Sequence, residues 1–184
     1  MSTTASSAPA ATSTVATVYQ EQVVTRSSAR KVLAVARITI GFTFLWAFVD
    51  KLFGLGFATP AERAWINGGT PAQGFIQGIE GPFAGFFQAF ANPFGDVLFM
   101  IGLLGIGVAL VLGAGLKIAA VTGSLLMLFM YLAEIPFVLG GNNPVVDSHW
   151  HEALLLVVAA ATLSGDTWGV GRIWGRIVGN SWLR

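Results

Sequence analysis

The chain has 184 residues, of which 54% are hydrophobic and only 10% are charged, and its mean hydropathy is +0.71. Soluble globular domains carry about 25% charged residues, so this composition excludes a soluble domain and predicts a membrane protein. Cysteine is absent and the net charge is only +1, which excludes disulfides and thiol chemistry and gives no electrostatic basis for binding nucleic acid.

Residues 1–30 form the first predicted segment. Up to Ser28 it is rich in Ser, Thr and Ala, and it contains no hydrophobic run of the signal-peptide type. A segment of this composition does not bury enough apolar surface to fold. We therefore predict a disordered tail over 1–30, which the topology below assigns to the cytoplasm.

Four long apolar stretches follow, each close to the ~20 residues that a helix needs to cross the ~30 Å hydrocarbon core. Their apolar residues are continuous rather than alternating, which favours helices over a β-barrel. We predict an all-α membrane protein whose domain, residues 31–167, is a four-transmembrane-helix bundle. The predicted helices cover residues 31–56, 96–113, 116–139 and 147–165.

The connection between the first two predicted helices, residues 58–95, is too long for a simple turn. Apolar residues recur in it at spacings of three and four, from Phe75 to Phe94. Such a stripe is typical of short helices that lie in the membrane interface or tuck over the mouth of a bundle. We expect an interfacial or re-entrant helical segment here, and the alternative is a packing cap with no ligand role.

Basic residues gather on one side of the four-pass arrangement. They are Arg26, Arg30, Lys31, Lys117, Arg172, Arg176 and Arg184. Short loops rich in Lys and Arg stay in the cytoplasm, so we expect a multi-pass protein of the cytoplasmic (inner) membrane with both termini cytoplasmic. Arg37, near the basic end of the first helix, is expected to snorkel back towards that side. Residues 168–184 interleave three tryptophans with three arginines, which predicts a cytoplasmic amphipathic tail at the lipid surface.

Seven of the nine carboxylates and both histidines lie at the opposite, outer side. Ionisable groups are costly near hydrocarbon, so their concentration there indicates a functional site. We expect Lys51 to pair with Glu134, and Asp50 to pair with His149 or Asn143. The alternative is that these groups form ion pairs that only lock the outer end of the bundle.

The histidine spacing argues against a metal or haem centre. His149 and His151 are two residues apart, about 200° around a helix, so they do not grip one metal from one face. The chain has no H-x3-H pair. Two histidines of one chain cannot bind opposite faces of a haem here, because both occupy one helical turn. No resident redox centre is predicted, so electron transfer would depend on a diffusible quinone or on a partner protein.

A quinone, menaquinone or ubiquinone, suits the outer polar residues because its reduction needs a proton source near its carbonyls. The candidate catalytic residues are His149, Asp147 and Glu134. The candidate cofactor-binding residues are Asp50, Lys51, Asn143, Trp46 and His151. Aromatic residues such as Trp46 suit a flat quinone ring, although membrane interfaces attract aromatics in any case.

Three passages carry a family resemblance: Leu45–Gly56 (LWAFVDKLFGLG), Gly81–Phe87 (GPFAGFF), and Glu134–His149 with its EIP and NNPVVDSH motifs. Together they resemble the DoxX family of small four-helix bacterial membrane proteins, most of all its actinobacterial branch, over Val32–Gly171. The family's polar signature corresponds to Asp50, Lys51, Glu134, Asn143, Asp147 and His149. His151 and Glu152 depart from the family pattern.

The resemblance implies an inner-membrane oxidoreductase component of the thiosulfate:quinone oxidoreductase type, with a sulfurtransferase or a superoxide dismutase as possible partner classes. The hypothesis is a DoxX-like subunit that handles quinone at its outer face. The alternative is a non-catalytic membrane anchor or assembly protein for redox partners, and whether the chain is itself an enzyme is left open. Small-residue rows in 96–113 and 116–139 are expected to pack these two helices together, or else to serve a homo-oligomer.

Overall fold

The computed structural model describes residues 16–134, 143 and 145–184. Within these residues the only regular secondary structure is helical, and there is no strand. Three helices are long and apolar enough to cross a membrane: α2 (Ser27–Phe53), α5 (Pro93–Leu112) and α6 (Leu116–Ala133). A fourth helix, α7 (Ser148–Ala161), has 14 residues, which is shorter than the ~20 of a complete span.

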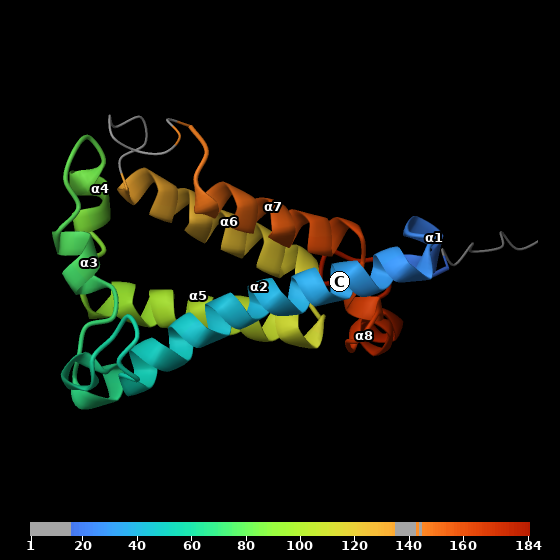
Figure 1. Ribbon diagram of the computed structural model, residues 1–184, viewed down its shortest axis with the longest axis horizontal. Helices are drawn as coiled ribbons and strands as arrows, with labels where there is room; N and C mark the ends of the chain where they lie inside the picture. The colour runs from blue at the N-terminus through green and yellow to red at the C-terminus, as the bar shows by residue number, and fades with distance from the viewer. Residues whose placement is uncertain (1–15, 135–142, 144) are drawn as a thin grey trace, which may run out of the picture.

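These four helices form two pairs. Figure 1 shows α2 lying along α5, and α6 lying along α7, with the turn after α5 joining the pairs. The part of the chain that the structure describes also contains seven short helices: α1 (Gln20–Val23), η1 (Ala61–Arg63), η2 (Trp65–Asn67), α3 (Gln73–Gln77), α4 (Ala84–Gln88), η3 (Ser164–Asp166) and α8 (Gly171–Val178). We call the two ends of the bundle the α3/α4 end and the α1/α8 end, after the short helices that Figure 1 shows there.

Glycines allow close approach within each pair. A Cβ on Gly107 of α5 would lie only 2.8 Å from the backbone nitrogen of Leu45 in α2, and a Cβ on Gly123 of α6 would lie 2.5 Å from Cδ1 of Leu156 in α7. Small residues at helix contacts are the usual basis of packing in lipid. The small-residue row predicted in 96–113 consists of Gly105, Ala109 and Gly113. Gly105 has open space around it, so this member of the row does not make the contact with α2.

Apolar side chains fill the interior and also cover the outside of the bundle. Phe44, Leu103, Leu110 and Leu156 belong to one buried cluster. Large apolar residues such as Ile101, Val121, Leu125 and Leu154 are exposed on the outward faces of the same helices. A surface of this kind requires a lipid environment, which supports the prediction of a membrane protein.

The segment between α2 and α5 contains the helical structure predicted for it. In α4, Phe86 and Phe87 make edge-to-face contacts with Phe129 of α6, with ring centroids 5.7 and 6.1 Å apart. Phe87, Ile79 and Ala133 form a second buried cluster. The α3–α4 segment therefore packs against the end of α6.

Part of the predicted disordered tail is ordered. Gln20 is fully buried, and its backbone N–H donates to Oδ2 of Asp166 at 2.9 Å. Its side-chain oxygen accepts a hydrogen bond from the hydroxyl of Thr167. The prediction of disorder over 1–30 is therefore wrong for the part that contains α1 and the start of α2. The composition of this part does not reveal its order, because the partner of Gln20, Asp166, lies 146 residues away in sequence. Residues 1–15 lie outside the described residues.

The predicted boundaries of the long helices differ from the observed ones by a few residues. The predicted end of the third helix at Leu139, with Pro136, lies outside the described residues. In the predicted amphipathic tail, α8 exposes Ile173 and Ile177 beside Arg172 and Arg176. This arrangement matches the amphipathic pattern predicted for 168–184.

Candidate functional site

Three of the predicted site residues meet at the α3/α4 end of the bundle. Glu134 is the residue at which α6 ends, Asp147 is the N-cap of α7, and His149 is the second residue of α7. Because α6 and α7 run antiparallel side by side, the end of one lies next to the start of the other (Figure 1). One ligand atom from each residue lies within 4.8 Å of the others. Glu134, Asp147 and His149 are called the acid–histidine cluster below.

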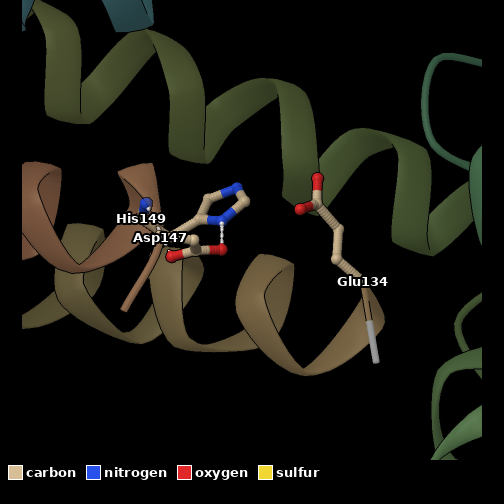
Figure 2. Close-up of side chains that lie close together, drawn as sticks. All are labelled: Glu134, Asp147 and His149. Atoms are coloured by element: carbon tan, nitrogen blue, oxygen red, sulfur yellow. Dashed lines mark hydrogen bonds and ion pairs between the residues drawn. The ribbon is translucent and has the colours of Figure 1, made fainter. Parts of the chain in front are cut away.

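Asp147 and His149 form the closest contact in this cluster. Oδ1 of Asp147 accepts the backbone N–H of His149 at 3.0 Å, which is the usual N-cap interaction. Oδ2 of the same carboxylate lies 2.7 Å from Nδ1 of the His149 ring, the contact drawn in Figure 2. The side chains are 13% exposed for His149 and 29% exposed for Asp147. Both side chains are thus largely buried but still accessible to solvent.

The charge state of Asp147 follows from these contacts. Partial burial by itself would raise the pKa of the carboxyl, but the hydrogen bond and the charge of His149 and the backbone N–H groups of His149 and Trp150 lower it, and the net pKa shift is downward. An ionised carboxylate is only an acceptor, so Nδ1 of His149 is the donor in the contact. In the neutral ring, Nε2 then carries the free lone pair.

Glu134 joins the cluster to a cavity. The carboxylate of Glu134 points towards the Asp147–His149 pair (Figure 2). The same residue lines a shallow, widely open cavity of about 440 Å³ between the α3 segment and the end of α6, together with Phe75, Ile79 and Glu80. The cavity wall therefore combines apolar surface with two carboxylates.

Asp50 is not part of this cluster. It is 1% exposed, and its carboxylate accepts the backbone N–H groups of Phe57 at 3.3 Å and Ala58 at 2.9 Å. The chain turns back at Gly54, where φ is +66°, and this turn brings the two N–H groups over the end of α2. The predicted pairing of Asp50 with His149 or Asn143 is wrong, because the adjacent loop satisfies the carboxylate first.

Lys51 and Trp46 also make their contacts elsewhere. Nζ of Lys51 lies 6.0 Å from the ring centroid of Phe99 in α5, and among the described residues it makes no ion pair with Glu134. Trp46 contacts Phe57 edge to face with centroids 5.0 Å apart, and it stacks on Phe42. These residues shape the α2 side of the bundle and are not joined to the cluster.

Of the last two predicted site residues, Asn143 precedes α7 and His151 lies in its first turn. The side-chain oxygen of Asn143 accepts the backbone N–H groups of Val145 and Val146, at 2.9 and 3.0 Å, which forms the turn that leads to α7. His151 is exposed and lies outside the acid–histidine cluster.

Two buried charges have roles that the sequence did not reveal. Asp96, at the start of α5, accepts the backbone N–H groups of Ala72 and Gln73 at 2.8 and 3.2 Å, so it fixes the α3 segment to α5. Arg37 is 1% exposed and does not snorkel to the surface. The sequence does show that Arg37 is a charged residue inside an apolar stretch, which marks it as a candidate for a structural or functional role. Residue spacing does not predict its hydrogen-bond partners.

Arg37 joins the last carbonyls of α5 to the segment before α8. It donates to the carbonyls of Leu110 and Val111, and also to those of Thr167 and Trp168, the last two at 3.2 and 3.0 Å. Nearby, Arg184 and Asp166 form a buried ion pair at 2.9 Å. Buried charges at the α1/α8 end therefore hold segments together, whereas the acid–histidine cluster at the other end is partly open.

Comparison with known proteins gives no relative: no family model, no curated protein and no solved structure matches the chain.

Proposed function

We propose that the protein is a membrane subunit of an oxidoreductase system that binds a quinone head group at its α3/α4 end. The observation that carries the proposal is that Glu134 belongs both to the acid–histidine cluster and to the wall of the 440 Å³ cavity. Proton-transferring groups thus lie beside a space with an apolar wall, which is the usual composition of a small-molecule site.

The residues present fit a quinone. A quinone supplies two-electron redox chemistry that takes up two protons at its carbonyl oxygens. Phe75 and Ile79 offer apolar surface to a flat ring, and the imidazole of His149 and the carboxylate of Glu134 offer groups that can accept or donate a proton. Cysteine is absent from the chain, so thiol chemistry does not compete with this assignment.

Each residue of the cluster has a distinct part in the proposal. His149 accepts or donates a proton at Nε2, because Nδ1 is held by Asp147. Asp147 orients the ring through its contact with Nδ1, as the carboxylate of a catalytic triad does. Glu134, which is exposed, exchanges protons between the cluster and water. Electrons come from a partner redox protein, for which the resemblance suggests a sulfurtransferase or superoxide dismutase complex.

The topology follows from the same proposal. In this arrangement α7 forms the fourth pass of a DoxX-like bundle, and the chain turns after it at Leu163, where φ is +49°. Lys117 and the arginines of α8 lie at the α1/α8 end, which the positive-inside rule assigns to the cytoplasm. The acid–histidine cluster then faces the outer side of the cytoplasmic membrane.

A binding measurement tests the proposal. Purified full chain in nanodiscs, treated with EDTA, is dialysed against a short-chain ubiquinone or menaquinone analogue, and the bound quinone is measured by chromatography. We expect saturable binding that His149→Gln weakens at least tenfold. His151→Gln is the matched control, because this second histidine lies outside the cluster, and it should bind as the wild type does. Absence of saturable binding to the folded wild type would reject the proposal.

One observation favours the alternative, a non-catalytic anchor or assembly protein. Two of the outer carboxylates, Asp50 and Asp96, are occupied by backbone N–H groups of neighbouring loops. In that case the chain binds no quinone but co-purifies with redox proteins from native membranes, and His149→Gln leaves the activity of the recovered complex unchanged.

A further inference from the structure

The acid–histidine cluster has the composition of a three-ligand metal site. Imidazole nitrogen with carboxylate oxygen is the ligand set that zinc and related divalent transition metals accept in proteins. One such atom from each of Glu134, Asp147 and His149 lies within 4.8 Å of the others. From the sequence alone, a metal site needs ligands from several helices at once, and the missing H-x3-H pair disfavours it. The structure brings such ligands together from two helices.

We propose that Glu134, Asp147 and His149 bind one divalent transition-metal ion of the zinc class. This inference goes beyond quinone binding, and the binding itself does not depend on it. The site joins the end of α6 to the start of α7, so the ion would clamp the two helices at the α3/α4 end.

The geometry requires only a small adjustment. Zinc bonds of about 2.1 Å in a tetrahedral site place ligand atoms about 3.4 Å apart, against the observed limit of 4.8 Å. Nδ1 of His149 lies 2.7 Å from the Asp147 carboxylate, so an ion between them would replace the Nδ1 proton and widen this contact to about 3.4 Å. The third ligand must move closer, and it comes from Glu134. Its side chain is exposed and rotates without disturbing the packed core.

The surroundings also favour an ion that exchanges with solvent. Asp147 caps the helix that carries His149 and contacts Nδ1 of its ring, so two of the three ligand groups already lie together at the start of α7. Three protein ligands leave a fourth position for water, as in zinc sites that are not purely structural. Glu134 is exposed and the other two side chains are partly exposed, so an ion can enter from outside.

Direct metal binding by the full chain tests the inference without any quinone. The protein carries a streptavidin-binding tag rather than a histidine tag, is stripped with chelator, and is titrated with Zn²⁺ alone by equilibrium dialysis. We expect one ion per chain, and at least tenfold weaker binding for Glu134→Gln and for His149→Gln. Co²⁺ bound in place of Zn²⁺ should give the visible absorption of a low-symmetry four-coordinate site, and His149→Gln should abolish it.

His151→Gln is the control, because it removes the neighbouring histidine and leaves the cluster intact. Circular dichroism and thermal unfolding of each apo-variant establish that it is folded. The inference is overturned if folded wild type binds less than one ion at micromolar Zn²⁺, or if His151→Gln lowers the affinity as much as His149→Gln. If the protein binds Zn²⁺ but no quinone, this inference stands and the proposed function is rejected. If it binds quinone but no Zn²⁺, the proposed function stands and this inference is rejected.

Discussion

The carboxylate of Asp147 holds His149 at two points, because one oxygen accepts the backbone N–H at 3.0 Å and the other contacts Nδ1 of the ring at 2.7 Å. The first contact caps α7, and the second fixes the orientation of the imidazole. One residue therefore links the stability of the helix to the chemistry of the cluster, and substitutions can separate these two roles.

Asparagine at position 147 should preserve the cap and lose the charge, whereas alanine should lose both. We expect Asp147→Ala to lower the free energy of unfolding by about 1 kcal/mol, the usual cost of a lost N-cap, and Asp147→Asn to lower it by much less. Both variants should bind Zn²⁺ more weakly than the wild type. Chemical unfolding in detergent and metal dialysis measure the two effects. Equal stability losses for Asn and Ala would contradict the capping role.

The lowered pKa of Asp147 predicts how its contribution varies with pH. A carboxyl whose folded-state pKa lies below its unfolded value stabilises the fold above the unfolded pKa of about 3.9. This contribution is lost as the pH falls through the lower, folded-state pKa. Below about pH 4, the unfolding temperature of the wild type should therefore fall more steeply than that of Asp147→Asn. Parallel curves for the two proteins between pH 6 and about pH 3 would contradict the assignment.

Neighbouring charges at the end of α2 should differ sharply in their importance. Asp50 is buried and accepts two backbone N–H groups, so Asp50→Ala leaves both donors without their partner and should cost about 1–3 kcal/mol. Lys51 is partly exposed and lies over Phe99 without an ion pair among the described residues, so Lys51→Met should cost less than about 1 kcal/mol. Thermal unfolding of the two variants side by side distinguishes these outcomes. Equal losses would indicate that Lys51 has a charged partner after all.

The sequence predicted the helices well because continuous apolar runs and loop charges are local signals. It predicted which polar residues lie at the α3/α4 end, since the position of a residue along a helix sets its depth. It did not predict which of these residues meet. Asp50 accepts hydrogen bonds from the loop that follows it, and Asp96 accepts them from a segment 24 residues away. Residue spacing predicts neither set of partners.

The packing faces were harder to predict than the helices. Gly105 and Gly107 are equally small, and only the arrangement of α2 against α5 shows that Gly107 carries the contact. The acid–histidine cluster has the same origin, because its ligands come from the end of one helix and the start of the next. Spacing within one helix excludes a site on that helix and gives no information about a site between two.

The two glycines of α5 give a matched test of the packing. Gly107→Ala places a Cβ 2.8 Å from the backbone nitrogen of Leu45, so α2 and α5 must separate, at a cost of about 1–3 kcal/mol. Gly105→Ala adds the same methyl group where nothing lies within 4 Å, and it should be neutral or slightly stabilising, because alanine is the better helix former. Unfolding by a denaturing detergent compares the two. A greater loss for Gly105→Ala would show that the predicted small-residue row makes the contact in the membrane.

Arg37 should act at the α1/α8 end without affecting the cluster at the other end. Its guanidinium joins the carbonyls of Leu110 and Val111 to those of Thr167 and Trp168, and lysine does not provide the planar fork needed to reach both pairs. We expect Arg37→Lys to lower the free energy of unfolding by about 1.5–3 kcal/mol, as for a lost hydrogen bond to a charged group. Amide exchange at Val170, whose N–H donates to the carbonyl of Leu112 at 2.8 Å, should become faster. Arg63→Lys, at an exposed position of η1, is the control for the substitution itself and should change neither quantity. Zn²⁺ affinity should stay at the wild-type value in Arg37→Lys, because Arg37 and the acid–histidine cluster lie at opposite ends of the bundle. A large loss of affinity would show that the two ends are coupled.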